Sequence, residues 1–379
     1  MKVLVLATKY FGMGGAEAYT RMFTQAVASG GAAVDILSFL NGELAERVYP
    51  GRYLGDQGSR SSPWTKLRFL SETMRRGHRY DLVVCSHAAV APLGMLLFRL
   101  FRIPYTVIGY GIDVWGDLGS VRRLALQRAA RVVVLSRFTA QMVATVQGVP
   151  LDRIDVVYPA VDPRLFALAE AAVPPSPGGP IRLLTVARLS ALERYKKCDT
   201  IISALSAVQA AAGPVHYMIV GDGDDRRRLE AVAHKEGVAP MVTFAGMIQG
   251  GASLVAQYQA CDIFVMPSVC EQRPDGWAGE GFGIVYIEAA AFGRPVIAGT
   301  GGGAPEAVQD GVTGLVADGR SVEAVAAVII RLSKDPDLRR EMGEAGRRWV
   351  REHFTLPRFQ REVEAVVAAA VTSRESRPR

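Results

Sequence analysis

Two glutamates, Glu280 and Glu288, stand with seven residues between them in a segment that also contains Gly281 and Gly283. Paired carboxylates can serve as the acid and base of a glycosidase, where they lie roughly 5–9.5 Å apart. Eight helical steps span about 12 Å, but the glycines indicate a turn at Glu280, so the separation is not set by the spacing.

The same glycines favour a second interpretation, in which the segment binds an anion and a sugar. Backbone N–H groups of Phe282, Gly283 and Ile284 would open a helix towards a phosphate. Glu288, a turn further on, would accept hydrogen bonds from sugar hydroxyls, because a carboxylate only accepts and suits a vicinal diol.

Two cations, Arg188 and Lys196, follow an apolar run at residues 181–186. A diphosphate leaving group requires such neutralisation, and each charge-assisted hydrogen bond contributes roughly 1.5–3 kcal/mol. Two cations with helix termini could replace a metal ion in stabilising a departing nucleotide. The alternative is that both are solvated charges beside a loop.

Glycine loops follow two other apolar runs. Gly12-Met13-Gly14-Gly15-Ala16-Glu17 opens a helix, where bare N–H groups attract phosphate. The third glycine of the dinucleotide fingerprint falls on Glu17, which disfavours an NAD-dependent dehydrogenase. Asp222 and Asp224, between Gly221 and an arginine run, form an Asp-x-Asp pair that favours a strand-to-helix turn over a metal site.

The secondary-structure pattern alternates short β-branched runs with amphipathic stretches along most of the 379 residues. The exception is residues 40–80, a looser region rich in Gly, Arg and Ser, which we expect to be irregular. Such alternation predicts an α/β fold with parallel sheets covered by helices. Four prolines within 173–180 predict a linker. We therefore expect two doubly wound Rossmann-like domains, 1–172 and 181–352, facing across a cleft that is the default ligand site. A final helix and tail, 353–379, are expected to pack back on the first domain.

Charge and cysteine content narrow the partners. Residues 1–170 hold 20 Lys+Arg and 13 Asp+Glu, which accounts for the whole net charge of +7. This basic half, with Leu67 and Phe69 among its arginines, indicates an anionic partner, either a phosphate-bearing acceptor or a membrane surface rather than nucleic acid. The alternative is that the excess charge only forms a solvated face. Four scattered cysteines, and an apolar start too short for a signal peptide, favour the cytoplasm. The five histidines form no local metal motif.

The chain resembles the family 4 retaining glycosyltransferases, which have the GT-B fold, over nearly its whole length. No single motif is specific, but their order and placement together are. They are Gly14-Gly15-Ala16-Glu17, Tyr110-Gly111-Ile112-Asp113, Ser136-Arg137-Phe138, Tyr158 to Asp162, Val186 to Leu189, Glu193 to Lys196, Val220 to Gly223, Phe244-Ala245-Gly246, Glu280 to Ile284, Glu288-Ala289 and Gly301 to Glu306.

The resemblance implies a nucleotide-sugar donor held by the second domain, an acceptor on the first, and front-face attack assisted by the leaving phosphate. Glu288 would bind the ribose, and Arg188 and Lys196 would bind the diphosphate. The backbone near Met247 would bind the base. No metal or cofactor is implied. The residues expected at the reacting centre are Glu280, Arg188, Lys196, Tyr110 and Asp113, and those expected to bind the donor are Gly14, Gly15, Gly221, Met247, Ile248, Phe282, Gly283, Ile284 and Glu288.

Three departures from the family pattern bear on these expectations. Tyr110 stands where many members have histidine, and a phenol titrates near 10. Lys197 replaces the usual glycine after the phosphate-binding lysine. Residues 269–279 form a longer lead-in to Glu280 than usual, which contacts a substrate or only covers the site.

Three functions remain in view. The first is a hexosyltransferase that uses GDP-mannose or a UDP-hexose and acts on a lipid-linked, polysaccharide or other glycan acceptor of the cell envelope, at the inner face of the membrane. The second is a nucleotide-sugar epimerase of the same fold. The third is a non-catalytic nucleotide-sugar-binding protein. Base, sugar and acceptor are not readable from the residues.

Overall fold

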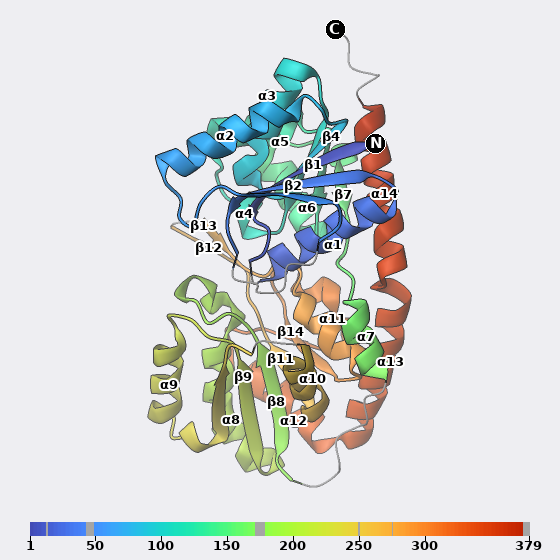
Figure 1. Ribbon diagram of the computed structural model, residues 1–379. Helices are drawn as coiled ribbons and strands as arrows, with labels where there is room; N and C mark the ends of the chain where they lie inside the picture. The colour runs from blue at the N-terminus through green and yellow to red at the C-terminus, as the bar shows by residue number, and fades with distance from the viewer. Residues whose placement is uncertain (13, 43–48, 171–178, 249–250, 275, 374–379) are drawn as a thin grey trace. The chain divides into compact units, whose positions relative to one another are not determined.

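The computed structural model describes residues 1–12, 14–42, 49–170, 179–248, 251–274 and 276–373, and these form two compact units (Figure 1). The first unit comprises Met1–Pro159 and Pro357–Arg379, and the second comprises Ala160–Leu356. The units therefore divide at Pro159, thirteen residues before the predicted boundary. Helix α7 (Pro163–Glu170) explains the difference, because it packs against α10 (Gly251–Ala260) and α11 (Ile284–Ala291) of the second unit. Most of the predicted linker lies outside the described residues.

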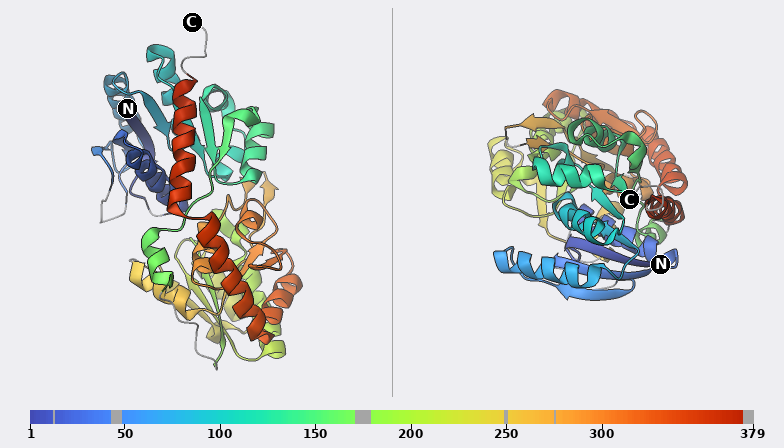
Figure 2. Two further views of the ribbon diagram at one scale, coloured as in Figure 1. Left: turned by 90° about the vertical axis from the view of Figure 1, so that its right-hand side faces the viewer. Right: turned by 90° about the horizontal axis from the view of Figure 1, so that it is seen from above.

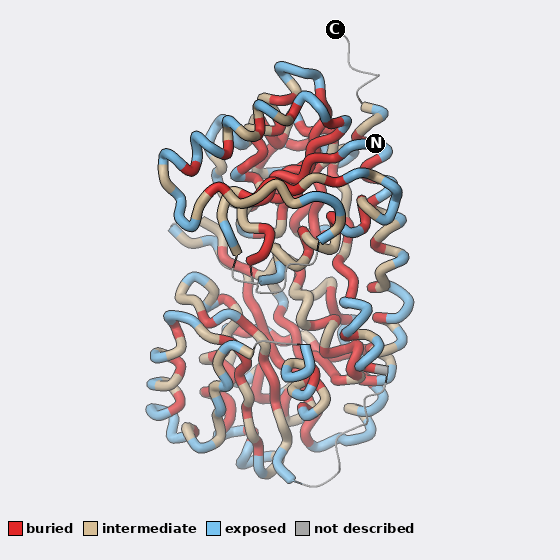
Figure 3. The backbone as a smooth tube through the Cα atoms, in the orientation of Figure 1, coloured by how far each residue is buried: buried red, intermediate tan, exposed pale blue. Residues whose placement is uncertain are grey.

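The first unit contains a parallel sheet whose inner strands are buried, whereas its edge strand β3 is partly exposed (Figure 3). Val3 to Leu6 of its inner strand β1 are fully buried, as expected for an apolar run covered by helices. The described strands lie in the order β3-β2-β1-β4-β5-β6-β7, with bounds β1 Lys2–Lys9, β2 Ala33–Leu40, β3 Arg52–Asp56, β4 Leu82–Cys85, β5 Tyr105–Gly109, β6 Arg131–Val134 and β7 Ile154–Val156.

Helices α1 to α6 and α14 complete this unit. On α14, Phe359 packs edge-on against Tyr19 of α1 with ring centroids 5.4 Å apart, and Arg358 donates to the carbonyl of Pro159 at 3.0 Å. Figure 2 shows α14 as the long red helix near the carboxyl end. The bounds are α1 Gly15–Ser29, α2 Pro63–Gly77, α3 Ala91–Phe101, α4 Ile112–Trp115, α5 Gly119–Arg128, α6 Arg137–Gln147 and α14 Leu356–Thr372.

The second unit repeats the topology. Its described strands lie in the order β10-β9-β8-β11-β14-β15, so the first strand of each unit is again flanked by the second and fourth, as in the Rossmann order. The strands are β8 Ile181–Val186, β9 Val215–Val220, β10 Val242–Gly246, β11 Ile263–Met266, β14 Val296–Gly299 and β15 Gly314–Ala317. The remaining helices are α8 Cys198–Ala212, α9 Arg226–Lys235, α12 Val322–Lys334 and α13 Pro336–His353. The predicted α/β class is confirmed.

Two features were not predicted from the sequence. The first is β3 with α2, in a stretch expected to be irregular. Helix α2 begins at Ser62, whose side chain accepts from the Thr65 N–H, with Pro63 in the first turn. The second is the hairpin of β12 (Glu271–Arg273) and β13 (Gly276–Ala278). Among the described residues, no helix has the length and apolar character needed to cross a membrane.

Candidate active site

The predicted donor residues of the second unit follow the carboxyl ends of neighbouring parallel strands. Arg188 follows β8, Gly221 follows β9 and Met247 follows β10. The segment that contains Glu280 lies between β11 and α11, and β11 is the neighbour of β8 on the other side. Strands β8 and β11 thus flank the point where the strand order reverses, which is where open parallel sheets bind ligands.

Arg188 and Lys196 meet on one carboxylate. Glu193 pairs with Arg188 through one oxygen and lies 2.7 Å from Lys196 Nζ through the other. The side chains of Glu193 and Lys196 are 10% and 14% exposed, whereas that of Arg188 is 64% exposed. Burial opposes ionisation of Glu193, but Lys196 and Arg188 outweigh it and hold its pKa below the ordinary value. The two cations therefore lie together, with a net positive charge available to an anion.

Glu280 lies close enough to Lys196 to interact with it electrostatically. Burial raises the pKa of Glu280, while Lys196 and the N–H groups of Gly281 and Phe282 oppose the rise. Two of the three predicted anion-facing positions, Gly283 and Ile284, lie at the start of α11. The N–H of Phe282 instead points to the Glu280 carboxylate.

Gly283 begins α11 with φ +85°, and it contributes no side-chain cap. A Cβ at this position would come within 2.4 Å of the Tyr286 ring, so only glycine fits the turn. The carbonyl of Glu280 accepts from the Gly303 N–H at 2.8 Å, which ties the turn to the loop after β14. The backbone at this helix start is thereby held in one conformation.

Glu288 accepts a hydrogen bond from the Tyr258 hydroxyl at 2.7 Å. Tyr258 belongs to α10 and is fully buried, stacked on Phe292 with centroids 5.4 Å apart. Burial raises the pKa of Glu288, and the Tyr258 hydrogen bond opposes the rise. The phenol thus fixes one carboxylate oxygen of Glu288, on the helix that starts at the Gly283 turn.

The Gly221–Asp224 turn is confirmed as a strand-to-helix connection between β9 and α9. A Cβ on Gly221 would come within 1.8 Å of the Ala187 carbonyl oxygen, so glycine permits close approach to the segment before Arg188. Asp224 accepts from the Ala191 N–H at 2.9 Å and Asp222 from the Gly223 N–H at 2.8 Å. Both carboxylates therefore have structural partners, Asp222 within the turn and Asp224 at the start of the segment Ala191–Lys196.

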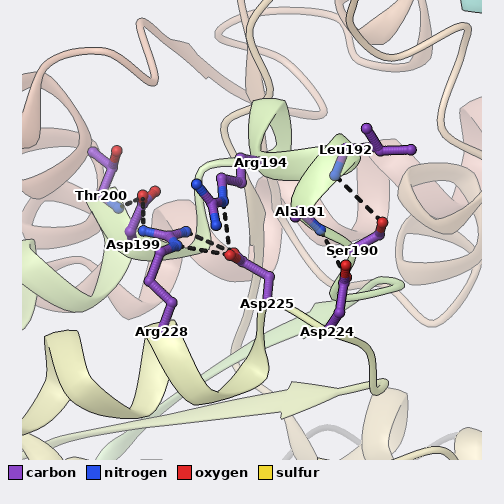
Figure 4. Close-up of polar contacts among 9 residues, drawn as sticks. All are labelled: Ser190, Ala191, Leu192, Arg194, Asp199, Thr200, Asp224, Asp225 and Arg228. Carbon is purple, nitrogen blue, oxygen red and sulfur yellow. Dashed lines mark hydrogen bonds and ion pairs between the residues drawn. The ribbon is translucent and has the colours of Figure 1, made fainter.

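Asp225 connects this turn to the short 3₁₀ segment Ala191–Lys196, and Figure 4 shows it between two arginines. It accepts from Arg194 Nε at 2.7 Å and from Arg228 Nε and Nη2 at 2.8 and 2.7 Å, and Arg228 also pairs with Asp199 at 2.8 Å. The Asp225 side chain is 4% exposed. Burial opposes its ionisation, but the two arginines hold its pKa below the ordinary value.

The residue after Lys196 has left-handed backbone. Lys197 has φ 59°, ψ 37° and stands between the 3₁₀ segment and α8. This conformation favours glycine, so the loop keeps its glycine-like path although a lysine occupies the position. Tyr195, in the same segment, packs with Val269 and Ala278, which places the base of the β12–β13 hairpin against the lysine loop.

In the first unit the glycine loop lies between β1 and α1. Gly14 is the N-cap of α1 with φ 152°, and both Gly14 and Gly15 are exposed. Arg21 donates to the carbonyls of Tyr10 and Gly12 at 2.9 and 3.0 Å, which holds the described part of the loop. The loop follows β1, which flanks the reversal point of this sheet.

Tyr110 and Asp113 lie beyond the end of β5. The Tyr110 hydroxyl lies 2.5 Å from Thr20 Oγ1, and Thr20 itself donates to the Ala16 carbonyl. Burial raises the pKa of Tyr110 above its ordinary value. Asp113 Oδ1 accepts from the N–H groups of Tyr110 and Gly111, both at 2.8 Å, and burial raises the pKa of Asp113.

Comparison with known proteins identifies the family. Residues 169–349 match the family model described as glycosyl transferases group 1, and residues 13–165 match the glycosyltransferase family 4 model. The GDP-mannose-dependent alpha-(1-6)-phosphatidylinositol monomannoside mannosyltransferase of Mycobacterium tuberculosis is 33% identical over 337 residues, covering 81% of this chain and 85% of that protein. The chain belongs to the family 4 glycosyltransferases.

Further matches agree with this family 4 assignment. The enzyme of the same name from Mycolicibacterium smegmatis is 34% identical over 291 residues, which cover 73% of each chain. Among solved structures, Anabaena Alr3699/HepE in complex with UDP and glucose has a TM-score of 0.78 at 20% identity, covering 97% of this chain and 100% of that one. WaaG, a glycosyltransferase of lipopolysaccharide biosynthesis, has a TM-score of 0.69 at 17% identity, covering 96% and 99%. The predicted GT-B fold is confirmed.

Sequence reasoning missed two residues of this glycosyltransferase, Tyr258 and Asp225. Tyr258 contacts Glu288 from 30 positions away, and Asp225 contacts Arg194 from 31 positions away, so no local spacing indicates either pair. A buried tyrosine or aspartate requires a polar partner, which was the available signal, although it does not name the partner.

Proposed function

We propose that this glycosyltransferase moves mannose from GDP-mannose to a lipid-linked acceptor, with retention of anomeric configuration and without a metal ion. The donor and acceptor classes are those named for the mycobacterial relatives, which align with most of the chain. The observation that carries the chemistry is the pairing of Arg188 and Lys196 on Glu193 beside the reversal point of the second sheet.

Each part of a nucleotide-sugar donor would have a matching group in the second unit. The diphosphate would take Arg188 and Lys196, and the two positive charges would stabilise the charge that develops on the leaving nucleotide. The oriented carboxylate of Glu288 would accept from the ribose hydroxyls. Met247, which is 47% exposed beyond β10, would contact the base together with Ile248. Glu280 would contact the sugar, beside the helix start at Gly283.

We also propose that this arrangement leads to retention of the anomeric configuration. The leaving phosphate oxygen would receive the proton of the attacking acceptor hydroxyl on the face that it departs from, so no protein nucleophile is required. Glu280, whose pKa is raised by burial, would hydrogen-bond the sugar rather than attack it.

A screen of nucleotide sugars with a defined acceptor tests the proposal. GDP-mannose, UDP-glucose and UDP-galactose would each be given with vesicles that contain phosphatidylinositol monomannoside, and transfer and free nucleotide would be measured. We expect α-mannosylated lipid from GDP-mannose alone, with its configuration read by proton NMR. An isomerised donor would indicate an epimerase, and nucleotide binding without turnover in any combination would indicate a binding protein.

The acceptor class also suggests where the enzyme meets a membrane. On α2, Trp64 and Leu67 are 75% and 54% exposed, and Lys66 and Arg68 are exposed beside them. An amphipathic surface with aromatic and basic side chains suits the interface of an anionic bilayer. We propose that this face docks the enzyme at the membrane that holds its acceptor. We expect Trp64→Ala to lose co-sedimentation with anionic vesicles at low salt. If the wild-type protein does not bind such vesicles, the docking proposal is wrong.

A further inference from the structure

His87 lies at the reversal point of the first sheet, two residues beyond Cys85, the last residue of β4. Strand β4 pairs with β1 on one side and with β5 on the other. The glycine loop therefore follows one neighbour of β4 and Tyr110 follows the other. This is the position at which a doubly wound sheet binds its ligand.

The imidazole of His87 is oriented by the backbone. Its Nδ1 accepts a hydrogen bond from the Ala89 N–H at 3.0 Å. Because Nδ1 is an acceptor there, the neutral ring carries its proton on Nε2. Within the part of the chain that the structure describes, no group accepts a hydrogen bond from Nε2, and the side chain is 33% exposed. An oriented N–H donor is thus presented to a ligand.

Asp113 lies next to this donor. Its Oδ2 lies 3.7 Å from His87 Nε2, too far for a hydrogen bond. Oδ2 is buried and has no hydrogen-bond partner among the described residues, whereas Oδ1 is held by the N–H groups of Tyr110 and Gly111. A carboxylate near Nε2 favours the imidazole tautomer that carries its proton on this nitrogen.

Tyr110, the nearest other candidate, has already used its proton. Thr20 donates to the Ala16 carbonyl, so the 2.5 Å contact between the two hydroxyls makes the Tyr110 phenol the donor to Thr20. The Tyr110 and His87 rings lie 6.5 Å apart between centroids. Of these two side chains, only His87 has an N–H or O–H to offer a substrate.

We propose that His87 binds the acceptor, donating from Nε2 to a hydroxyl oxygen of the acceptor polyol, with Asp113 as the positioning residue whose charge favours the proton on Nε2. The inference rests on the proposed function, because it assigns the acceptor to the first unit. The substrate class that this site recognises is then a hydroxyl-rich headgroup. The diphosphate is bound by other residues, Arg188 and Lys196.

Two amide variants of His87 distinguish a role in acceptor binding from a role in holding the backbone at Ala89. In His87→Gln the amide nitrogen reaches the place of Nε2 and can donate to the acceptor. In His87→Asn the amide oxygen reaches the place of Nδ1 and can accept from Ala89, but the donor is lost. His234→Gln, at an exposed position on α9, is the matched control.

The experiment measures transfer from GDP-mannose to vesicles that contain phosphatidylinositol monomannoside, and the rise in melting temperature that GDP causes. We expect His87→Asn to lower kcat/KM for the acceptor about 10- to 100-fold, the scale of one lost hydrogen bond to an oriented group. His87→Gln should lose less than about 10-fold, and the GDP-induced shift should stay at its wild-type value in both.

Asp113→Asn supplies a second measurement that does not alter the imidazole. It keeps the oxygen that receives the Tyr110 and Gly111 N–H groups but removes the charge, so we expect a smaller loss in kcat/KM for the acceptor at unchanged melting temperature. An active His87→Asn with an impaired His87→Gln would show a structural role and overturn the inference, as would normal rates in both. If wild-type enzyme transfers no sugar at all, the proposed function itself fails.

Discussion

The carboxylate of Glu193 lies 2.7 Å from the ammonium group of Lys196, with both side chains largely buried. The protein therefore keeps a counter-ion for Lys196 before any diphosphate binds. Glu193→Gln removes that charge and should lower the free energy of unfolding by about 1–3 kcal/mol, because a buried lysine loses its partner. We expect GDP to restore part of the loss, so its shift of melting temperature should exceed that of wild type.

Differential scanning fluorimetry with and without GDP measures this effect. Glu341→Gln, at an exposed position of α13, is the control and should behave as wild type. A destabilised Glu193→Gln whose GDP-induced shift is no larger than that of wild type would place the diphosphate away from Lys196.

Several parts of the fold were predictable because their signals are local. Apolar β-branched runs such as Val3–Leu6 define buried parallel strands, and the glycine turn at Gly283 marks the start of α11. Helix α2 was missed because its stretch is rich in glycine, arginine and serine, although Ser62-Pro63 is a helix-start signal.

The candidate site was predictable only where its residues follow strands. Arg188 and Lys196 could be located in this way, but their shared partner Glu193 was not assigned a role. The contacts of Glu288 with Tyr258 and of Arg194 with Asp225 join segments about 30 residues apart. Such pairs depend on how helices pack, which local spacing does not encode.

Asp225→Asn tests the anchor of the lysine loop. The folded pKa of Asp225 is lowered relative to the unfolded chain, so its ionisation stabilises the protein fully above the ordinary aspartate pKa of about 3.9. That contribution is lost as pH falls from there through the folded pKa. The stability difference between wild type and Asp225→Asn in urea should therefore be constant from pH 8 to 5 and shrink below about pH 4.

An Asp337→Asn control replaces an aspartate whose side chain is 82% exposed and should show little difference at any pH. A difference for Asp225→Asn that grows on acidification would contradict the assigned role of its two arginines.

Lys197→Gly addresses the left-handed residue after Lys196. Glycine adopts φ 59° without the steric cost of roughly 1–2 kcal/mol that an L side chain incurs, but it loses roughly 0.5–1 kcal/mol in chain entropy. We expect a net gain of up to about 1 kcal/mol in urea unfolding, whereas Lys197→Val should be clearly destabilised. Ala231→Gly, at an exposed position in the interior of helix α9, should lose about 1 kcal/mol. If Lys197→Gly is less stable than wild type, the side chain at position 197 does not strain the left-handed backbone, and this explanation is wrong.

Glu288 and its partner are testable through the ribose. If Glu288 accepts from ribose hydroxyls, a 3′-deoxy GDP-mannose should be a poorer substrate for wild type by roughly 10-fold or more, the scale of one charged hydrogen bond. Glu288→Ala should lose roughly 10²-fold with the normal donor and show no further loss with the deoxy donor. Tyr258→Phe should raise KM for the donor with little change in kcat. If the losses from Glu288→Ala and from the 3′-deoxy donor are additive, Glu288 does not bind the ribose hydroxyl.

We propose that Arg188 and Lys196 neutralise the diphosphate in place of a metal ion. The most direct measurement is kcat/KM for mannose transfer from GDP-mannose by wild type with excess EDTA, beside Lys196→Ala without it. We expect an unchanged rate with EDTA and a loss of roughly 10²-fold or more in Lys196→Ala. Turnover abolished by EDTA and restored by magnesium, or a near-normal Lys196→Ala, would contradict it.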